Sequence, residues 1–68
     1  MNEETINLGI RKFLKQFGVS AQREIERALQ AAEQSGQLPA SGVVKVAATL
    51  RIAGTARDFT IEGEIPLN

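Results

Sequence analysis

The stretch Gly18-Val19-Ser20-Ala21-Gln22-Arg23-Glu24-Ile25-Glu26 contains a signal that ends a helix and, directly after it, a signal that begins one. Gly18 can adopt the left-handed conformation that closes a helix. Ser20 can accept a hydrogen bond from a free N–H group in the first turn of a following helix. Only Val19 separates the two signals. The stretch therefore predicts two helices joined at a tight corner, with Gly18 at a positive φ.

The first helix is predicted over residues 3–17. Asn2 is a suitable N-cap, and Glu3 and Glu4 follow it in the first turn, where the helix dipole favours acidic side chains. Apolar residues then recur at helical spacing and predict one apolar side. These residues are Ile6, Ile10, Phe13, Leu14 and Phe17.

The second helix is predicted over residues 21–35. Its apolar residues also share one side, and most of them are small enough to let a partner helix approach closely. They are Ala21, Ile25, Ala28, Leu29 and Ala32. Gly36 is a natural stop, and residues 36–42 read as a loop.

From Val43 onward the apolar period changes to two, which predicts a β-hairpin over residues 43–66. Gly54-Thr55 suits a two-residue type II′ turn between Ala53 and Ala56. This register brings opposite charges together and pairs threonine with threonine, the favourable cross-strand combinations. The predicted pairs are Val44–Ile65, Lys45–Glu64, Ala48–Ile61, Thr49–Thr60, Leu50–Phe59 and Arg51–Asp58.

These elements predict an α+β fold of order α-α-β-β, formed by residues 1–68 as a single small domain. The apolar face of the hairpin is expected to cover the apolar sides of both helices. Phe13 is expected in the resulting core.

Composition narrows the function classes. The chain has eight basic and eight acidic residues, a formal net charge of zero and a pI near 6.2. This balance disfavours a dedicated nucleic-acid binder and a polybasic membrane anchor. No apolar run approaches the ~20 residues of a membrane span, so the cytoplasm is the expected location.

No catalytic, cofactor-binding or metal-binding residues are expected. The chain has neither Cys nor His, so disulfides and ordinary zinc sites are excluded. Ser20 is explained as a helix cap, and Ser35 and Ser41 lie in turn-like contexts. Glu62 and Glu64 share one strand face, but a bare hairpin offers no cleft for acid–base chemistry. The sequence therefore argues against an enzyme.

A winged-helix-like nucleic-acid-binding protein is the alternative. Phe17-Gly18-Val19-Ser20 resembles the corner of a helix-turn-helix, and the hairpin resembles a wing. Glu24 and Glu26 on the following helix match phosphates poorly, and the usual third helix is absent.

The leading hypothesis is a small, non-catalytic interaction module that forms a weak homodimer or binds an unknown protein partner. Small domains without disulfides or metals often gain stability by association. The candidate interaction residues are Leu8, which points away from the apolar side of its helix, and the basic residues Arg11, Lys12 and Lys15. The unpaired outer edges of the hairpin are a second candidate surface.

The central stretch, together with three other segments, resembles a known family. These segments are Met1-Asn2-Glu3-Glu4-Thr5, Ile10-Arg11-Lys12-Phe13-Leu14-Lys15 and Gly63-Glu64-Ile65-Pro66-Leu67. The chain is similar to a family of small uncharacterised bacterial proteins, a domain of unknown function of about this length. The resemblance implies an α-α-β-β pattern and a bacterial cytoplasmic protein. It implies no activity, cofactor or catalytic residue.

Overall fold

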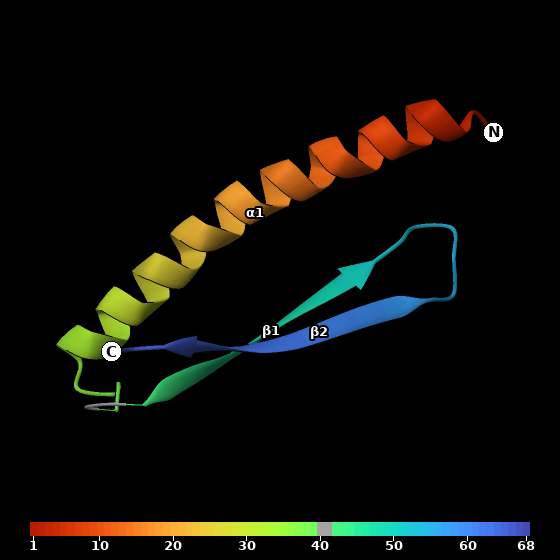
Figure 1. Cartoon of the computed structure of the whole chain (residues 1–68). Helices are drawn as coiled ribbons and strands as arrows, with labels where there is room; N and C mark the ends of the chain where they lie inside the picture. Colours follow the sequence, from red (N-terminus) through yellow and green to blue (C-terminus); the bar gives the residue numbers. More distant parts are fainter. Residues whose placement is uncertain (40–41) are drawn as a thin grey trace. The chain divides into compact units, whose positions relative to one another are not determined.

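The computed structural model describes residues 1–39 and 42–68. Helix α1 (Glu3–Gln34) is followed by strands β1 (Val43–Arg51) and β2 (Asp58–Pro66), as Figure 1 shows. The chain divides into two compact units, residues 1–38 and 39–68, and each is described by itself. The predicted α+β class is confirmed, but the predicted order of elements is wrong because there is one helix in place of two.

The beginning of α1 lies where the sequence predicted it. The side-chain oxygen of Asn2 accepts a hydrogen bond of 3.0 Å from the backbone N–H of Thr5. This bond satisfies one of the four N–H groups that have no partner inside the helix. Glu3 and Glu4 occupy the first turn, next to the positive end of the helix dipole.

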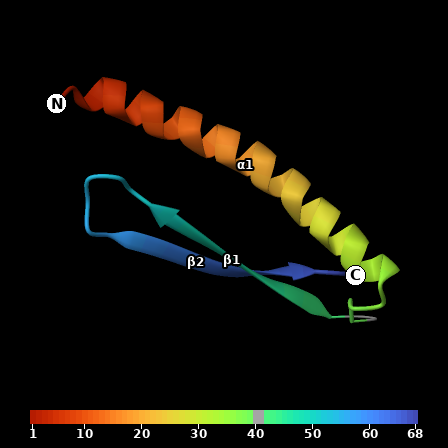
Figure 2. The same ribbon diagram turned by 180° about the vertical axis from the view of Figure 1, so that it is seen from behind.

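The predicted corner at Gly18 does not exist. Helix α1 runs through Gly18, Val19 and Ser20 without interruption, in both views of the chain (Figures 1 and 2). Gly18 is not among the described glycines with positive φ, and Ser20 lies inside the helix instead of capping one. The helix-turn-helix resemblance depended on this corner and loses its structural basis.

The energy of the backbone explains the continuous helix. A glycine inside a helix costs only ~1 kcal/mol relative to alanine. A break would leave four C=O groups and four N–H groups without helical partners. The apolar pattern also continues in phase across Gly18, because Phe17, Ala21 and Ile25 follow one another at intervals of four residues. No change of helix direction is needed to align the apolar residues.

The C-terminal end of α1 confirms Gly36 as the stop. Ser35 is the C-cap, and Gly36 has a φ of 75°. The N–H of Gly36 donates to the carbonyl of Glu33, and the N–H of Gln37 donates to that of Ala32 at 2.8 Å. This pair of bonds is the Schellman motif, which requires a left-handed residue after the C-cap. Part of the predicted 36–42 loop, including Ser41, lies outside the described residues.

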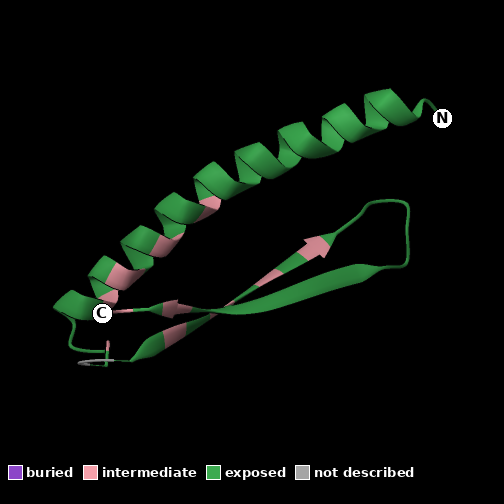
Figure 3. Cartoon of the chain, in the orientation of Figure 1, coloured by how far each residue is buried: buried purple, intermediate pink, exposed green. Residues whose placement is uncertain are grey.

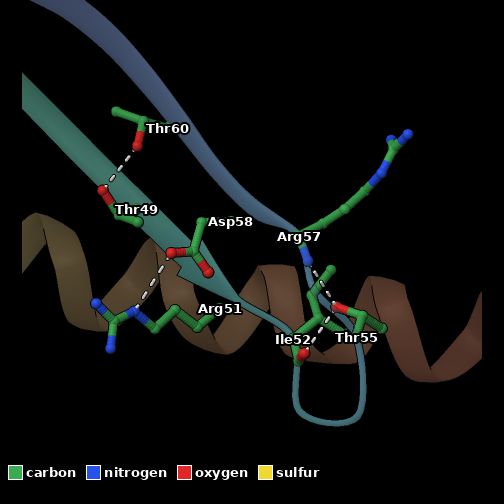
Figure 4. A network of polar contacts seen from close by, with 7 residues as sticks. All are labelled: Thr49, Arg51, Ile52, Thr55, Arg57, Asp58 and Thr60. Atoms are coloured by element: carbon green, nitrogen blue, oxygen red, sulfur yellow. Dashed lines mark hydrogen bonds and ion pairs between the residues drawn. The ribbon is translucent and has the colours of Figure 1, made fainter.

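The hairpin register is confirmed. All six predicted pairs face each other across the antiparallel strands. Val43 lies opposite Pro66 at the end of the hairpin away from the turn. The hydroxyl groups of Thr49 and Thr60 lie 2.9 Å apart, and Arg51 and Asp58 form an ion pair of 3.7 Å. Figure 4 shows both contacts. Cross-strand pairs of this kind stabilise a hairpin by ~0.2–1 kcal/mol each.

The predicted type II′ turn at Gly54-Thr55 is wrong by one residue. Strand β1 ends at Arg51 and strand β2 begins at Asp58. Between them, the carbonyl of Ile52 accepts a hydrogen bond of 3.2 Å from the N–H of Thr55. This turn is centred on Ala53 and Gly54, and Gly54 has a φ of 82°. A type II turn places glycine at this position.

The side chain of Thr55 accounts for the shifted turn (Figure 4). Its hydroxyl donates to the Ile52 carbonyl at 2.8 Å and accepts from the N–H of Arg57 at 3.3 Å. Threonine side chains commonly bond nearby backbone groups in this way and so compete with strand pairing. The loop therefore takes up residues 52–57 without changing the register of the strands.

No residue in the described part of the chain is buried, as Figure 3 shows. Phe13, the expected core residue, has 50% of its surface exposed. The expected cover of the helix by the hairpin stays a prediction.

We predict that Gly18→Ala stabilises the protein. A Cβ atom at Gly18 would meet no atom within 4 Å, and helical φ suits alanine. The gain of ~0.5–1 kcal/mol is expected to raise Tm by roughly 2–8 °C in a thermal melt followed by circular dichroism. Gly9→Ala, at the other glycine inside α1, is expected to behave in the same way.

Gly36→Ala is the matched control, because the φ of 75° at Gly36 is strained for alanine. This variant is expected to lower Tm. A lower Tm for Gly18→Ala as well would contradict the continuous helix.

We predict that Thr55→Val destabilises the hairpin by ~0.5–1.5 kcal/mol, because the loop loses both bonds to the hydroxyl. The control is Thr60→Val, which loses one exposed bond but gains a residue that favours strands. Urea unfolding curves are expected to show a clear loss for Thr55→Val and little change for Thr60→Val. Equal midpoints would show that the hydroxyl of Thr55 does not hold the loop.

Candidate interaction surfaces

A single apolar stripe runs along α1. The apolar sides predicted for two helices combine into one, because the helix is continuous. We call this set the apolar stripe: Ile6, Ile10, Phe13, Leu14, Phe17, Ala21, Ile25, Ala28, Leu29 and Ala32. Between Ile6 and Ala32 the stripe extends for roughly 40 Å at a rise of ~1.5 Å per residue.

The two halves of the apolar stripe differ in side-chain size. The first half carries isoleucine, leucine and both aromatic residues, and the rings of Phe13 and Phe17 stack with centroids 6.3 Å apart. Phe13 is 50% exposed and Phe17 is 39% exposed, so the ring pair is available for contact. The second half is rich in alanine. The apolar stripe therefore has large side chains in the first half of α1 and small side chains in the second half.

The four candidate residues predicted from the sequence all lie on α1 and share one side of it. The distance along the chain from Leu8 is three residues to Arg11, four to Lys12 and seven to Lys15. Residues at these intervals lie on the same side of a helix. We call this side the basic face. Leu8 is 65% exposed, and the basic face points away from the apolar stripe. Its role in binding stays a prediction.

The second half of α1 satisfies some of its charges locally. Arg27 and Glu24 form an exposed ion pair of 3.3 Å, and the amide of Gln22 donates to Glu26 at 3.1 Å. Exposed pairs at this spacing contribute a few tenths of a kcal/mol. Among the described residues, the ion pairs are Arg27–Glu24 and Arg51–Asp58. Arg11, Lys15 and Glu26 take no part in them.

The hairpin has one apolar face and one polar face, as its alternation predicted. On the apolar face, Leu50 lies opposite Phe59 and Ala48 opposite Ile61, and both β2 residues are exposed. On the polar face, Lys45 lies opposite Glu64. With only two strands, each strand also has one unpaired edge.

A shallow, open hollow of about 420 Å³ lies over the middle of the hairpin. Val46, Ala47 and Gly63 line it. Lys45, Glu62 and Glu64 also line it. The two carboxylates share one strand face and are exposed, as the alternation predicted.

Residues 1–39 and 42–68 place no three acidic, histidine or cysteine side chains together around a position for a metal ion. Helix α1, the helix of the described chain, lacks the apolar stretch that crossing a lipid bilayer requires.

Sequence reasoning missed the continuity of the apolar stripe. The signal was present in the unbroken spacing of Phe17, Ala21 and Ile25 across the supposed corner. The local capping preferences of Gly18 and Ser20 predict a break in the helix, whereas this long-range phase predicts a continuous helix.

Comparison with known protein families gives a match over the whole chain. The model of a family described as a family of unknown function, DUF6494, matches residues 1–68. No curated protein and no solved structure matches the chain.

Proposed function

The chain belongs to the DUF6494 family of unknown function, and from that premise we propose that it is a non-catalytic interaction module that associates with itself. The observation that carries the proposal is the exposure of its apolar side chains. No described residue is buried, while Phe13, Phe17, Phe59 and Ile61 are all exposed.

Physical chemistry makes this exposure informative. Most helical stability in proteins comes from packing of an apolar side, and a two-stranded hairpin alone is at best marginally stable in water. The conformational entropy lost on folding is offset mainly by burial of apolar surface. The apolar stripe and the apolar strand face therefore need further contacts to be stable, and we propose a second copy as their source.

Two surfaces support association of this kind. The unpaired strand edges can extend the sheet into a second copy, although Lys45 and Arg51 on β1 disfavour such pairing. A patch that includes Leu8 on the basic face can contact a second copy or a different protein. Nucleic acid is not part of the proposal, because the corner that suggested it is helical. The cytoplasm is the compartment we propose, on sequence grounds.

We predict that folding and association are coupled. Sedimentation equilibrium from micromolar to millimolar protein is expected to show the mass rising from that of the 7.4 kDa chain toward a dimer. Over the same range Tm is expected to rise with concentration, because a partner that binds only folded chains stabilises them by mass action.

The opposite result is equally clear. A monomer mass at every concentration, with a Tm that does not change, would overturn the proposed self-association. The apolar stripe would then be covered by the chain's own hairpin, as the sequence first suggested.

A further inference from the structure

We propose that copies of the chain associate through unlike strand edges, so that the outer edge of β1 in one copy pairs antiparallel with the outer edge of β2 in another. This inference rests on the proposed self-association and assigns the two surfaces that meet. It depends on the hairpin unit alone.

Backbone hydrogen bonding identifies the residues that form the outer edges. The N–H of Leu67 donates to the carbonyl of Gly42 at 2.9 Å, so this pair and every second pair after it exchange bonds inside the hairpin. The intervening pairs direct their N–H and C=O groups outward. The outward residues are Val43, Lys45, Ala47, Thr49 and Arg51, which form the β1 edge, and Asp58, Thr60, Glu62, Glu64 and Pro66, which form the β2 edge.

The outward backbone groups have no partner strand within the described chain. The sheet has two strands, and the backbone of α1 makes its hydrogen bonds within the helix. An unpaired strand edge is a template for a further strand. A second copy can supply that strand wherever α1 lies.

The two edges carry opposite charges. The β1 edge has two cations, Lys45 and Arg51, and the β2 edge has three carboxylates, Asp58, Glu62 and Glu64. All five side chains are exposed. Pairing two β1 edges would bring the cations of both copies together, and pairing two β2 edges would do the same to the carboxylates. Charge therefore selects a β1 edge against a β2 edge.

The ladder inside the hairpin indicates the register between copies. Strands β1 and β2 already pair over nine residues each, with opposite charges at two positions. The side chains of a strand are available to the neighbouring strands on both of its sides, so the same register at the outer edges repeats the same favourable pairs. Lys45 then faces Glu64 of the partner subunit, and Arg51 faces Asp58 of the partner subunit. This register also sets outward backbone groups against outward backbone groups.

The last residue of β2 limits the contact at one end. Pro66 has no N–H, so its pair with Val43 of the partner subunit makes one hydrogen bond instead of two. The contact is heterologous, because a dimer of this kind keeps one free β1 edge and one free β2 edge. Association therefore continues past the dimer when the protein concentration is raised further.

Disulfide trapping tests which edges meet, and the chain has no native cysteine. Chains carrying Thr49→Cys are mixed with chains carrying Thr60→Cys and oxidised gently, and mass spectrometry identifies the linked chains. We expect a mixed disulfide, because facing residues of a hydrogen-bonded pair have Cα atoms ~5.5 Å apart. Val43→Cys in place of Thr49→Cys is the matched control. It is expected to stay unlinked, because six residues, or ~20 Å of strand, separate position 60 from the position that faces Val43.

A chain that carries both Thr49→Cys and Thr60→Cys distinguishes edge pairing from an exchange of strands between copies. Oxidised in dilute solution, it closes its own hairpin with a disulfide, because positions 49 and 60 face each other within the chain. We expect the closed chain to associate with a constant within about threefold of the parent, measured by sedimentation equilibrium. Loss of association in the closed chain would overturn edge pairing.

A charge exchange tests the register. The double variant Lys45→Glu with Glu64→Lys keeps opposite charges within its own hairpin and between two copies of itself. Between a variant copy and a parent copy, like charges face each other at this pair. We expect the variant to associate with itself as the parent does and to bind the parent about fivefold or more weakly. Equal affinity of the variant for itself and for the parent would overturn the register.

The outcomes separate the inference from the proposed function. Disulfides formed by Thr49→Cys chains alone would show paired β1 edges, those formed by Thr60→Cys chains alone would show paired β2 edges, and either would overturn the inference. A dimer mass with no mixed disulfide would place the interface elsewhere, such as at the patch with Leu8, and would overturn the inference while self-association stands. A monomer mass at all concentrations would overturn both.

Discussion

The unbroken hydrogen bonding of α1 through Gly18 is the constraint on which the described arrangement depends. Ending a helix leaves four carbonyl groups without helical partners, and beginning another leaves four N–H groups in the same state. Retaining one glycine within the helix costs far less. The caps are therefore found at Asn2 and at Ser35–Gly36, where side-chain and Schellman bonds satisfy the exposed groups. Because the helix continues, its apolar residues form one long stripe instead of two short sides meeting at a corner.

The hairpin obeys a different constraint. Its register is held by pairs that act across the strands, including the Thr49–Thr60 contact and the Arg51–Asp58 ion pair. A shift by one residue would move every side chain to the other face and would separate these pairs. The loop is less constrained, and the hydroxyl of Thr55 determines where its turn forms. The register of the strands and the position of the turn are therefore determined by different contacts.

These constraints direct attention to surfaces for the function of this DUF6494 member. The apolar stripe carries large residues in the first half of α1 and alanine in the second. The basic face, with Leu8 at 65% exposure, lies on a different side of α1.

The sequence by itself determined the α+β class, both ends of the helical region and the pairing of every strand residue that was predicted. Those features depend on local chemistry: an Asn cap, a glycine that can take positive φ, and alternation with matched charges. Gly18 and Ser20 show the limit of such signals, because each residue can serve as a cap or continue a helix at little cost. Only the structure decided between these states, through hydrogen bonds that extend over the whole helix. It also placed the turn at Ala53–Gly54, because the bonds of Thr55 to Ile52 and Arg57 depend on the three-dimensional path of the loop.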